Sequence, residues 1–131
     1  MKLLTEESIL FFLRRPEALP LWEESLAPWL ERQFPETVMK VQKTQITLKG
    51  RIGFLAISIP PEKLAAGDRS AILLTFGLDH AIEWHRIAMA VPISPNRITY
   101  HTVVRGPEDL DEELLFYLKE AWHMANLEKR R

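Results

Sequence analysis

The chain contains no cysteine among its 131 residues. This absence excludes disulfide bonds, thiolate metal sites and a cysteine nucleophile, and it fits a protein that stays in a reducing compartment. No uncharged apolar run approaches the roughly 20 residues that a membrane-spanning helix needs. The first residues of the chain do not have the pattern of a secretory signal peptide. We therefore expect a cytoplasmic protein.

The sequence motifs that define several common enzyme classes are also missing. With only five glycines in the chain, a glycine-rich loop that holds phosphate through backbone N–H groups is not expected. Neither a GxSxG nor an HExxH sequence is present, which excludes the usual serine-hydrolase and zinc-protease signatures. We therefore predict no catalytic residue, no metal site and no cofactor from motifs, and any function must be inferred from weaker patterns.

Charge is nearly balanced in total, at −1, but it is unevenly distributed along the chain. Residues 37–106 carry nine basic and four acidic side chains, a net charge of +5, whereas residues 1–36 and 107–131 each carry −3. Two interpretations stay open. The charges belong to solvated sheet and helix faces that attract one another weakly, or the basic middle of the chain recognises an anion.

The length and the apolar patterns predict a single α+β domain over residues 1–131. Residues 5–34 form a helical lead-in of two helices, because Thr5 can cap the first and apolar residues recur at helical spacing in both. Pro28 lies inside the second pattern and is expected to kink that helix.

The rest of the chain predicts a sheet followed by one long helix. Residues 37–105 change to strand periodicity with short turns, which favours an antiparallel sheet of four to five strands. Residues 107–126 predict a C-terminal helix packed on the sheet, since apolar residues recur at helical spacing. Asp109 and Glu112, three residues apart, match a capping box at its start.

The stretch KVQKTQITLK, residues 40–49, contradicts a simple strand. Met39 and Val41 are apolar on one parity, whereas Ile46 and Leu48 are apolar on the other. A β-bulge near residues 43–45 would return the later pair to the core face, and we favour it over a Lys43 side chain directed into the core.

A polar constellation on the predicted sheet is the candidate site. Its members are Lys43, Thr44, Gln45, Arg51, Thr99, His101 and Arg105. Cations mixed with hydrogen-bonding side chains can bind phosphate, carboxylate or a nucleic-acid backbone. The first hypothesis is a non-enzymatic recognition module for an anionic ligand, nucleic acid or protein partner, with affinity that falls above neutral pH as His101 loses its proton.

Three alternatives to that hypothesis stay open. The constellation is only the solvated outer face of a sheet, or the protein is a small enzyme that uses His101 as a general acid or base. In the third alternative the protein is a purely structural module that forms a symmetric homodimer through an exposed edge or face.

Two acidic or histidine-rich stretches receive structural interpretations. The segment DHAIEWHR gathers metal-ligand types, but its spacing matches no zinc template, so we interpret it as an exposed turn with Ile82 and Trp84 packed beneath. The carboxylates between Glu108 and Glu113 fall at a helix start, where negative charge complements the helix dipole.

Several stretches resemble one bacterial family, described only as domain of unknown function 5655. They are VMKVQKTQITLKGRIGFLAIS, AILLTFGL, RITYHTVVRGPEDLDEELLFYLKEAW and the helical FFLRRPEALPLWEESLAPWL, with KTQI and LDEEL the most telling. The resemblance covers residues 9–125. It implies no assigned activity, and because similar domains also occur at the C-termini of larger bacterial proteins, it favours recognition over catalysis. A looser similarity links the chain to frataxin-like iron chaperones, but the chain lacks an acidic or histidine-rich ridge that would bind iron. In the pattern of family 5655 the strand around His101 often carries one or two histidines, and Tyr100 fills one of those places.

Overall fold

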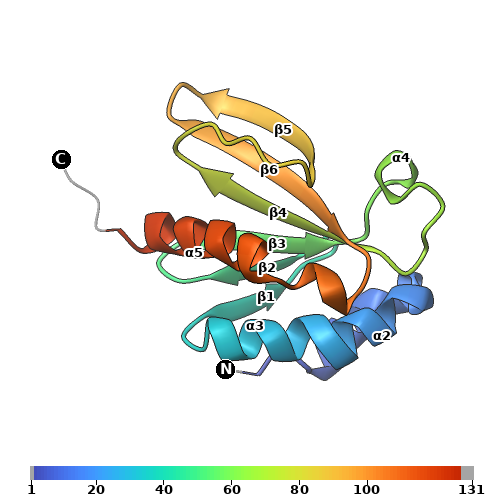
Figure 1. The fold of residues 1–131 in the computed structure, drawn as a ribbon. Helices are drawn as coiled ribbons and strands as arrows, with labels where there is room; N and C mark the ends of the chain where they lie inside the picture. Colours follow the sequence, from blue (N-terminus) through green and yellow to red (C-terminus); the bar gives the residue numbers. More distant parts are fainter. Residues whose placement is uncertain (1, 128–131) are drawn as a thin grey trace.

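A computed structural model describes residues 2–127 and shows an α+β fold built on one antiparallel sheet (Figure 1). The sheet has six strands, one more than the upper limit predicted from the sequence, in the order β1-β2-β3-β4-β6-β5. Their bounds are β1 Val38–Val41, β2 Ile46–Lys49, β3 Gly53–Ser58, β4 Ile72–Leu78, β5 Ile87–Ser94 and β6 Arg97–Val104. Among residues 2–127, no helix has the length and hydropathy to cross a bilayer.

The extra strand resolves the parity conflict in residues 40–49, and the predicted β-bulge there is wrong. The chain reverses instead: β1 and β2 form a hairpin whose last pair is Val41 with Ile46, and the N–H of Gln42 donates to the carbonyl of Gln45 at 2.8 Å. Four loop residues separate the strands, so apolar residues of opposite parity reach the same face. Lys43 is exposed in that loop rather than directed inward.

The helical lead-in is more broken than the two predicted helices. Thr5 caps α1 as expected, with Ser8 completing a capping box. The helical elements are α1 Glu6–Phe11, two 3₁₀ turns at Phe12–Arg14 and Pro16–Ala18, α2 Leu19–Leu21, a π-helical turn at Trp22–Leu26 and α3 Ala27–Gln33. In the π turn the N–H of Ala27 donates to the carbonyl of Trp22. This wider turn directly precedes Pro28, whose ring would clash with the carbonyl four residues back in a regular α-helix.

The C-terminal helix α5, Glu112–Asn126, starts later than predicted. Asp111 is its N-cap and accepts from the N–H of Leu114, so the predicted capping box at Asp109 is wrong. Residues Pro107–Asp109 form a separate 3₁₀ turn. Asp109 accepts instead from the backbone N–H of Arg105, which ties the turn to the end of β6.

One continuous core lies between the helices and the sheet. Its largest fully buried members are Trp22, Phe12 and Phe76, and α5 packs on β3 and β4. The ring of Trp122 on α5 lies 6.0 Å from that of Phe34 at the end of α3 and 5.1 Å from that of Phe54. Alternate residues of the strands therefore face this core and the opposite, helix-free face of the sheet.

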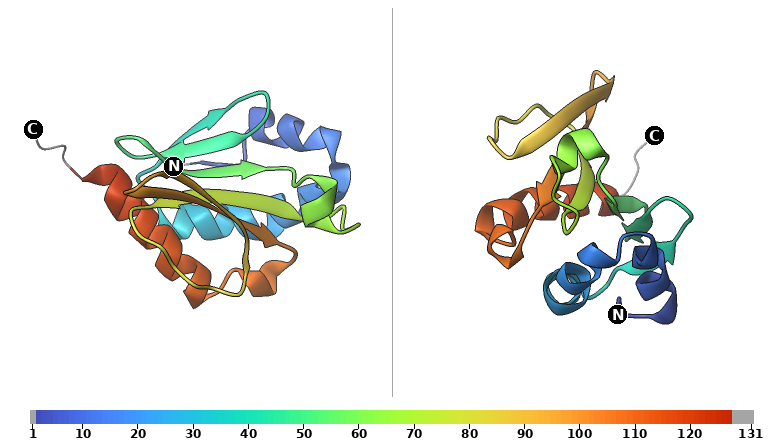
Figure 2. Two further views of the ribbon diagram at one scale, coloured as in Figure 1. Left: turned by 90° about the horizontal axis from the view of Figure 1, so that it is seen from above. Right: turned by 90° about the vertical axis from the view of Figure 1, so that its right-hand side faces the viewer.

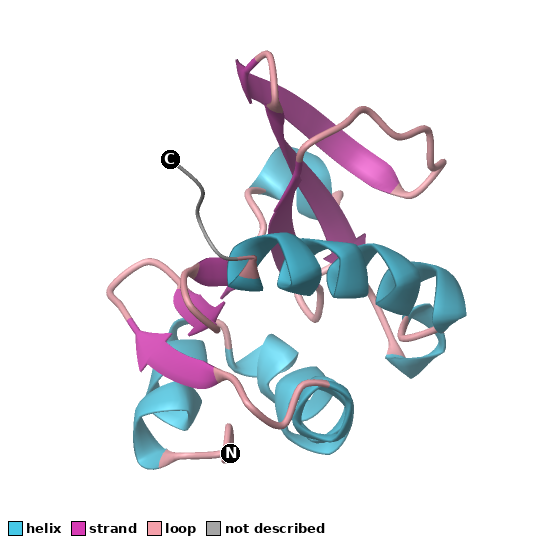
Figure 3. Ribbon diagram, turned by 90° about the vertical axis from the view of Figure 1, so that its left-hand side faces the viewer, coloured by secondary structure: helices cyan, strands magenta, loops and turns pink. Residues whose placement is uncertain are grey.

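The sheet is divided into two halves between β3 and β4. Only three pairs join these strands, from Ser58 with Leu73 to Ala56 with Thr75, whereas seven join β4 to β6. Figure 3 shows the two halves as separate groups of strands. Figure 2, right, shows the β5–β6 hairpin standing apart from the N-terminal helices, with the rest of the molecule between them. The division opens a wedge in the middle of the sheet.

Candidate functional site

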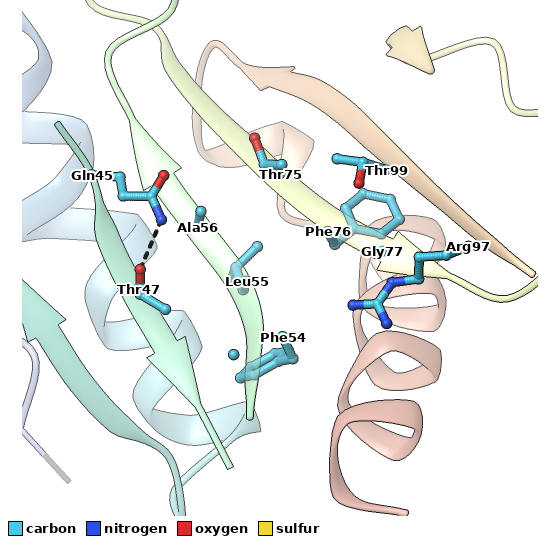
Figure 4. Close-up of a pocket in the computed structure, with 11 residues that line it drawn as sticks. Gln45, Thr47, Phe54, Leu55, Ala56, Thr75, Phe76, Gly77, Arg97 and Thr99 are labelled. Atoms are coloured by element: carbon cyan, nitrogen blue, oxygen red, sulfur yellow. Dashed lines mark hydrogen bonds between the residues drawn. The ribbon is translucent and has the colours of Figure 1, made fainter. Parts of the chain in front are cut away.

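A groove of about 200 Å³ occupies this wedge. Figure 4 shows the side chains that line it. The polar ones are Gln45, Thr47, Thr75, Arg97 and Thr99. The apolar and small ones are Gly53, Phe54, Leu55, Ala56, Phe76 and Gly77. The groove therefore has one charged side chain, several neutral hydrogen-bonding groups and an apolar wall.

Register across the sheet explains why the polar groups meet. Thr47 pairs with Ala56, Ala56 with Thr75, and Thr75 with His101. Paired residues of neighbouring strands point to the same face, so these four side chains form a row across the helix-free face. Thr99 lies two residues from His101 on β6 and faces the same way.

Arg97 extends over Gly77 toward the gap between β3 and β4 (Figure 4). A Cβ atom at position 77 would lie 2.7 Å from Nε of Arg97, so glycine leaves the space that the guanidinium occupies. Among residues 2–127, no hydrogen bond or ion pair holds this guanidinium. Its charge does lower the pKa of Asp79, after the larger effects of His80 on that carboxyl.

The hydroxyl and amide groups at the β2 side of the groove are linked to one another. Nε2 of Gln45 donates to Oγ1 of Thr47 at 2.9 Å, and the Thr47 hydroxyl donates to Oε1 of Gln42 at 2.6 Å. These two hydrogen bonds orient the Thr47 hydroxyl. They use one of the two amide protons of Gln45, which leaves the other for a ligand.

His101 lies beside the groove and is held by Thr75. Oγ1 of Thr75 is 2.8 Å from Nδ1 of the imidazole. Partial burial lowers the pKa of His101 below its ordinary value and so favours the neutral ring. This shift acts against the protonated donor that we expect from the sequence near neutral pH.

The structure brings together only part of the predicted constellation. Gln45 and Thr99 line the groove and His101 adjoins it. Lys43 and Thr44 lie exposed at the tip of the β1–β2 hairpin, where the carbonyl of Lys43 accepts from Arg14 at 2.7 Å.

The other two predicted cations are engaged elsewhere. Arg51 lies in the β2–β3 connection and bonds to the end of α5, through its N–H to Asn126 and its guanidinium to the carbonyl of Leu127. The guanidinium of Arg105 donates to the carbonyls of Ala65 and Leu64 at 2.9 and 3.0 Å. Neither side chain lines the groove.

Sequence reasoning missed three polar residues of the groove, Thr47, Thr75 and Arg97, together with Gly77 beside Arg97 and the apolar and small residues of the lining. A signal for two of them was present in AILLTFGL, because Thr75 and Gly77 are the only non-apolar residues of that strand and share one parity. They mark the face that the helices do not cover. No sequence pattern pointed to Arg97, because it follows a turn and the orientation of its side chain depends on Gly77 in the neighbouring strand β4.

The DHAIEWHR segment is a connection between β4 and β5, as interpreted, with Trp84 buried. His80 lies 2.8 Å from Asp79 and 3.6 Å from Glu120 on α5, and these carboxylates, Asp79 first, raise its pKa. Within residues 2–127, no three His, Asp or Glu side chains converge to hold a metal ion.

The comparisons with known proteins show the family of the chain. A search of the curated proteins returned no match, and a search of the solved structures returned none. A family model described as Domain of unknown function matches residues 12–125, which is most of the chain. The resemblance inferred from the sequence is thereby confirmed, and the chain belongs to the family of the domain of unknown function DUF5655.

Proposed function

We propose that the protein is a non-enzymatic recognition module that binds an anionic group in the groove between β3 and β4. The observation that carries this proposal is the guanidinium of Arg97, which lies in the groove without a hydrogen-bond partner among residues 2–127. A guanidinium offers five N–H donors in a fixed fork and forms strong, charge-assisted bonds with carboxylate or phosphate oxygens.

The neighbouring groups supply orientation rather than further charge. The amide of Gln45 and the hydroxyl of Thr99 can each donate to an anionic oxygen, whereas the single hydroxyl proton of Thr47 is already donated to Gln42. The hydroxyl of Thr75 is free to donate only when Nδ1 of its partner His101 carries the imidazole proton. In the neutral form, which its lowered pKa favours, His101 supplies one donor or one acceptor beside the groove, depending on its tautomer. The site combines one cation with neutral donors, which suits a ligand that presents a single anionic group.

Substitution of Arg97 by glutamine tests this proposal. Amide NMR spectra of the full chain would be recorded during titrations with acetate, inorganic phosphate and a short single-stranded oligonucleotide. We expect at least one of these anions to shift the amide signals of Gly77 and Thr99 in the native chain and not in Arg97→Gln. Arg32→Gln, which removes another exposed arginine on α3, is the matched control. If no anion shifts these signals, the groove is only a solvated sheet face.

The contact between Thr75 and His101 favours a second candidate function, an enzyme that uses His101 as a general base. A neutral imidazole 2.8 Å from a hydroxyl in a groove is placed to accept the proton of that hydroxyl or of a water. Hydrolysis of a simple activated ester by the native chain and by His101→Gln separates the candidates. Equal rates support the recognition module, whereas a large loss in His101→Gln supports the enzyme.

Strand β5 bears on the alternative of a dimerisation module. It is an edge strand, paired only with β6, and Ile93 is 63% exposed at its end. Pro92 lies in the same strand, however, and proline at an edge strand hinders further pairing. Sedimentation at high protein concentration would test this alternative, because a monomer excludes it.

A further inference from the structure

We propose that the ligand of the groove is a monocarboxylate with a short apolar body, a class narrower than anions in general. The inference rests on the proposed recognition function and adds the chemical class of the ligand. It is drawn from three features of the groove: its charge, its wall and the unpaired strand edges beside it.

The charge around the groove favours a single negative charge over two. Among residues 2–127, Arg97 is the only charged side chain that lines it. An acidic group that feels its charge is Asp79, which is paired with His80, and His80 in turn faces Glu120 on α5. A carboxylate matches one guanidinium through two parallel hydrogen bonds. A phosphate dianion would leave one of its charges uncompensated, close to the Asp79 carboxylate.

The wall of the groove favours an apolar body beside that carboxylate. Phe54, Leu55 and Phe76 belong to its lining, with most of their apolar side-chain surface buried in the core behind it. The floor is made by residues with small or absent side chains, Gly53, Ala56 and Gly77. Its volume of about 200 Å³ lies below the roughly 300–1,000 Å³ typical of larger ligands. A body of a few carbon atoms therefore fits, and a nucleotide does not.

The divided sheet supplies additional hydrogen-bonding groups. The ladder between β3 and β4 ends at Ala56 with Thr75, so the facing peptide groups beyond this pair have no strand partner across the wedge. Buried peptide groups require a partner, which is protein, water or ligand. A carboxylate accepts up to four hydrogen bonds, so it can take donors from Arg97, from the hydroxyl of Thr99 and from this edge together.

A nucleic-acid backbone would need a different distribution of cations. Binding a strand of phosphates uses several cations, each releasing counterions, and is therefore strongly salt-dependent. Lys40 on β1 and Lys43 at the hairpin tip lie outside the groove lining. A strand that used them would depend on Lys40 and Lys43 as much as on Arg97.

The test is an amide NMR titration of the full chain with butyrate, with butyramide, with inorganic phosphate and with a short single-stranded oligonucleotide. Butyrate and butyramide share the apolar body and differ in charge. We expect butyrate to shift the signals of Gly77 and Thr99, and butyramide to leave them unchanged. The affinity for butyrate should fall by about tenfold to a hundredfold in Arg97→Gln, since a charge-assisted bond is lost. Arg97→Lys keeps the charge but loses the forked guanidinium. Its affinity for butyrate should therefore lie between that of the native chain and that of Arg97→Gln.

Each other outcome overturns a defined part of the account. If phosphate shifts the groove signals through Arg97 and butyrate does not, the carboxylate class is wrong and the anion-binding function stands. If an oligonucleotide binds and Lys40→Gln weakens it as much as Arg97→Gln, the ligand is a nucleic acid. If butyramide matches butyrate, the wall alone binds and Arg97 has no role. If nothing shifts these signals, the inference and the proposed function fail together.

Discussion

Arg97 and Arg105 lie at opposite ends of strand β6. Within residues 2–127, other groups of the protein bond to the guanidinium of Arg105 but not to that of Arg97. Arg105 donates to the carbonyls of Leu64 and Ala65 at the end of helix α4, Glu62–Ala65, and lies 3.4 Å from Asp68. Arg97 lies over Gly77 without such partners in the described chain. The same residue type therefore anchors a loop at one end of the strand and remains available to a ligand at the other.

Arg86, like Arg105, bonds to other parts of the protein. Its side chain is 17% exposed, bonds to Asp111 at 2.7 Å and to the carbonyl of Asp109 at 2.6 Å, and lies over the ring of Trp84. These contacts tie the β4–β5 connection to the start of α5. Two arginines of the basic middle of the chain, Arg86 and Arg105, thus stabilise loops between secondary-structure elements, whereas Arg97 does not.

Replacement of Arg86 by alanine should have the largest effect on stability. It removes two charge-assisted bonds and leaves the partly buried Asp111 without its cation, so we expect the free energy of unfolding to fall by about 2–3 kcal/mol. Urea unfolding followed by circular dichroism measures this. Arg86→Lys should lose less, because it keeps the charge. A loss below that of Arg97→Ala would contradict the division of the arginines.

Replacement of Arg105 by alanine should have a smaller effect, because its side chain is 41% exposed and water competes for its bonds. We expect a loss of about 1–2 kcal/mol, against a change within about 0.5 kcal/mol for Arg97→Ala. The same unfolding experiment compares the two variants directly. Equal losses would show that Arg97 has structural contacts after all.

Gly77→Ala should alter the site while leaving the fold intact. Position 77 lies outside the left-handed backbone region, so alanine fits the backbone, but its Cβ would displace the Arg97 side chain. We expect stability within about 0.5 kcal/mol of the native value and affinity for an anion reduced by about threefold to tenfold. Gly106→Ala is the matched control, since its Cβ would likewise displace a flexible side chain, that of the exposed Glu108 at 2.7 Å, but lies outside the groove lining. Unchanged affinity in Gly77→Ala would show that anion binding does not depend on the position of the Arg97 side chain over Gly77.

His101 should give the smallest effect, a shift in the pH dependence of stability. Burial lowers its pKa in the folded state, so at mildly acidic pH the unfolded chain binds more protons than the folded one. The contribution of His101 is complete above its ordinary pKa and is lost as pH falls through the lower, folded value. Thermal unfolding from neutral to acidic pH should show a weaker decline in His101→Gln. An identical decline would show that burial of His101 has no energetic effect.

The sequence predicted the fold more fully than the site, for physical reasons. Apolar periodicity reports which residues a core buries, so the lead-in, the sheet region and the C-terminal helix were foreseen. The hairpin at residues 42–45 was not, because no glycine or Asn-Gly pair marks the turn. The groove depends on where the β3–β4 ladder ends, and pairing between strands is not encoded in any local pattern. For the same reason the sequence favoured Arg105 over Arg97.

The most direct test of the account is the response of the arginine side chains themselves to an anion. The Nε–H signals of Arg86, Arg97 and Arg105 can be followed by NMR while butyrate is added to the native chain. We expect the signal of Arg97 to move with saturation, while those of Arg86 and Arg105 stay in place because their guanidinium groups are already bonded. Movement of Arg105 with Arg97 unchanged would contradict the central claim.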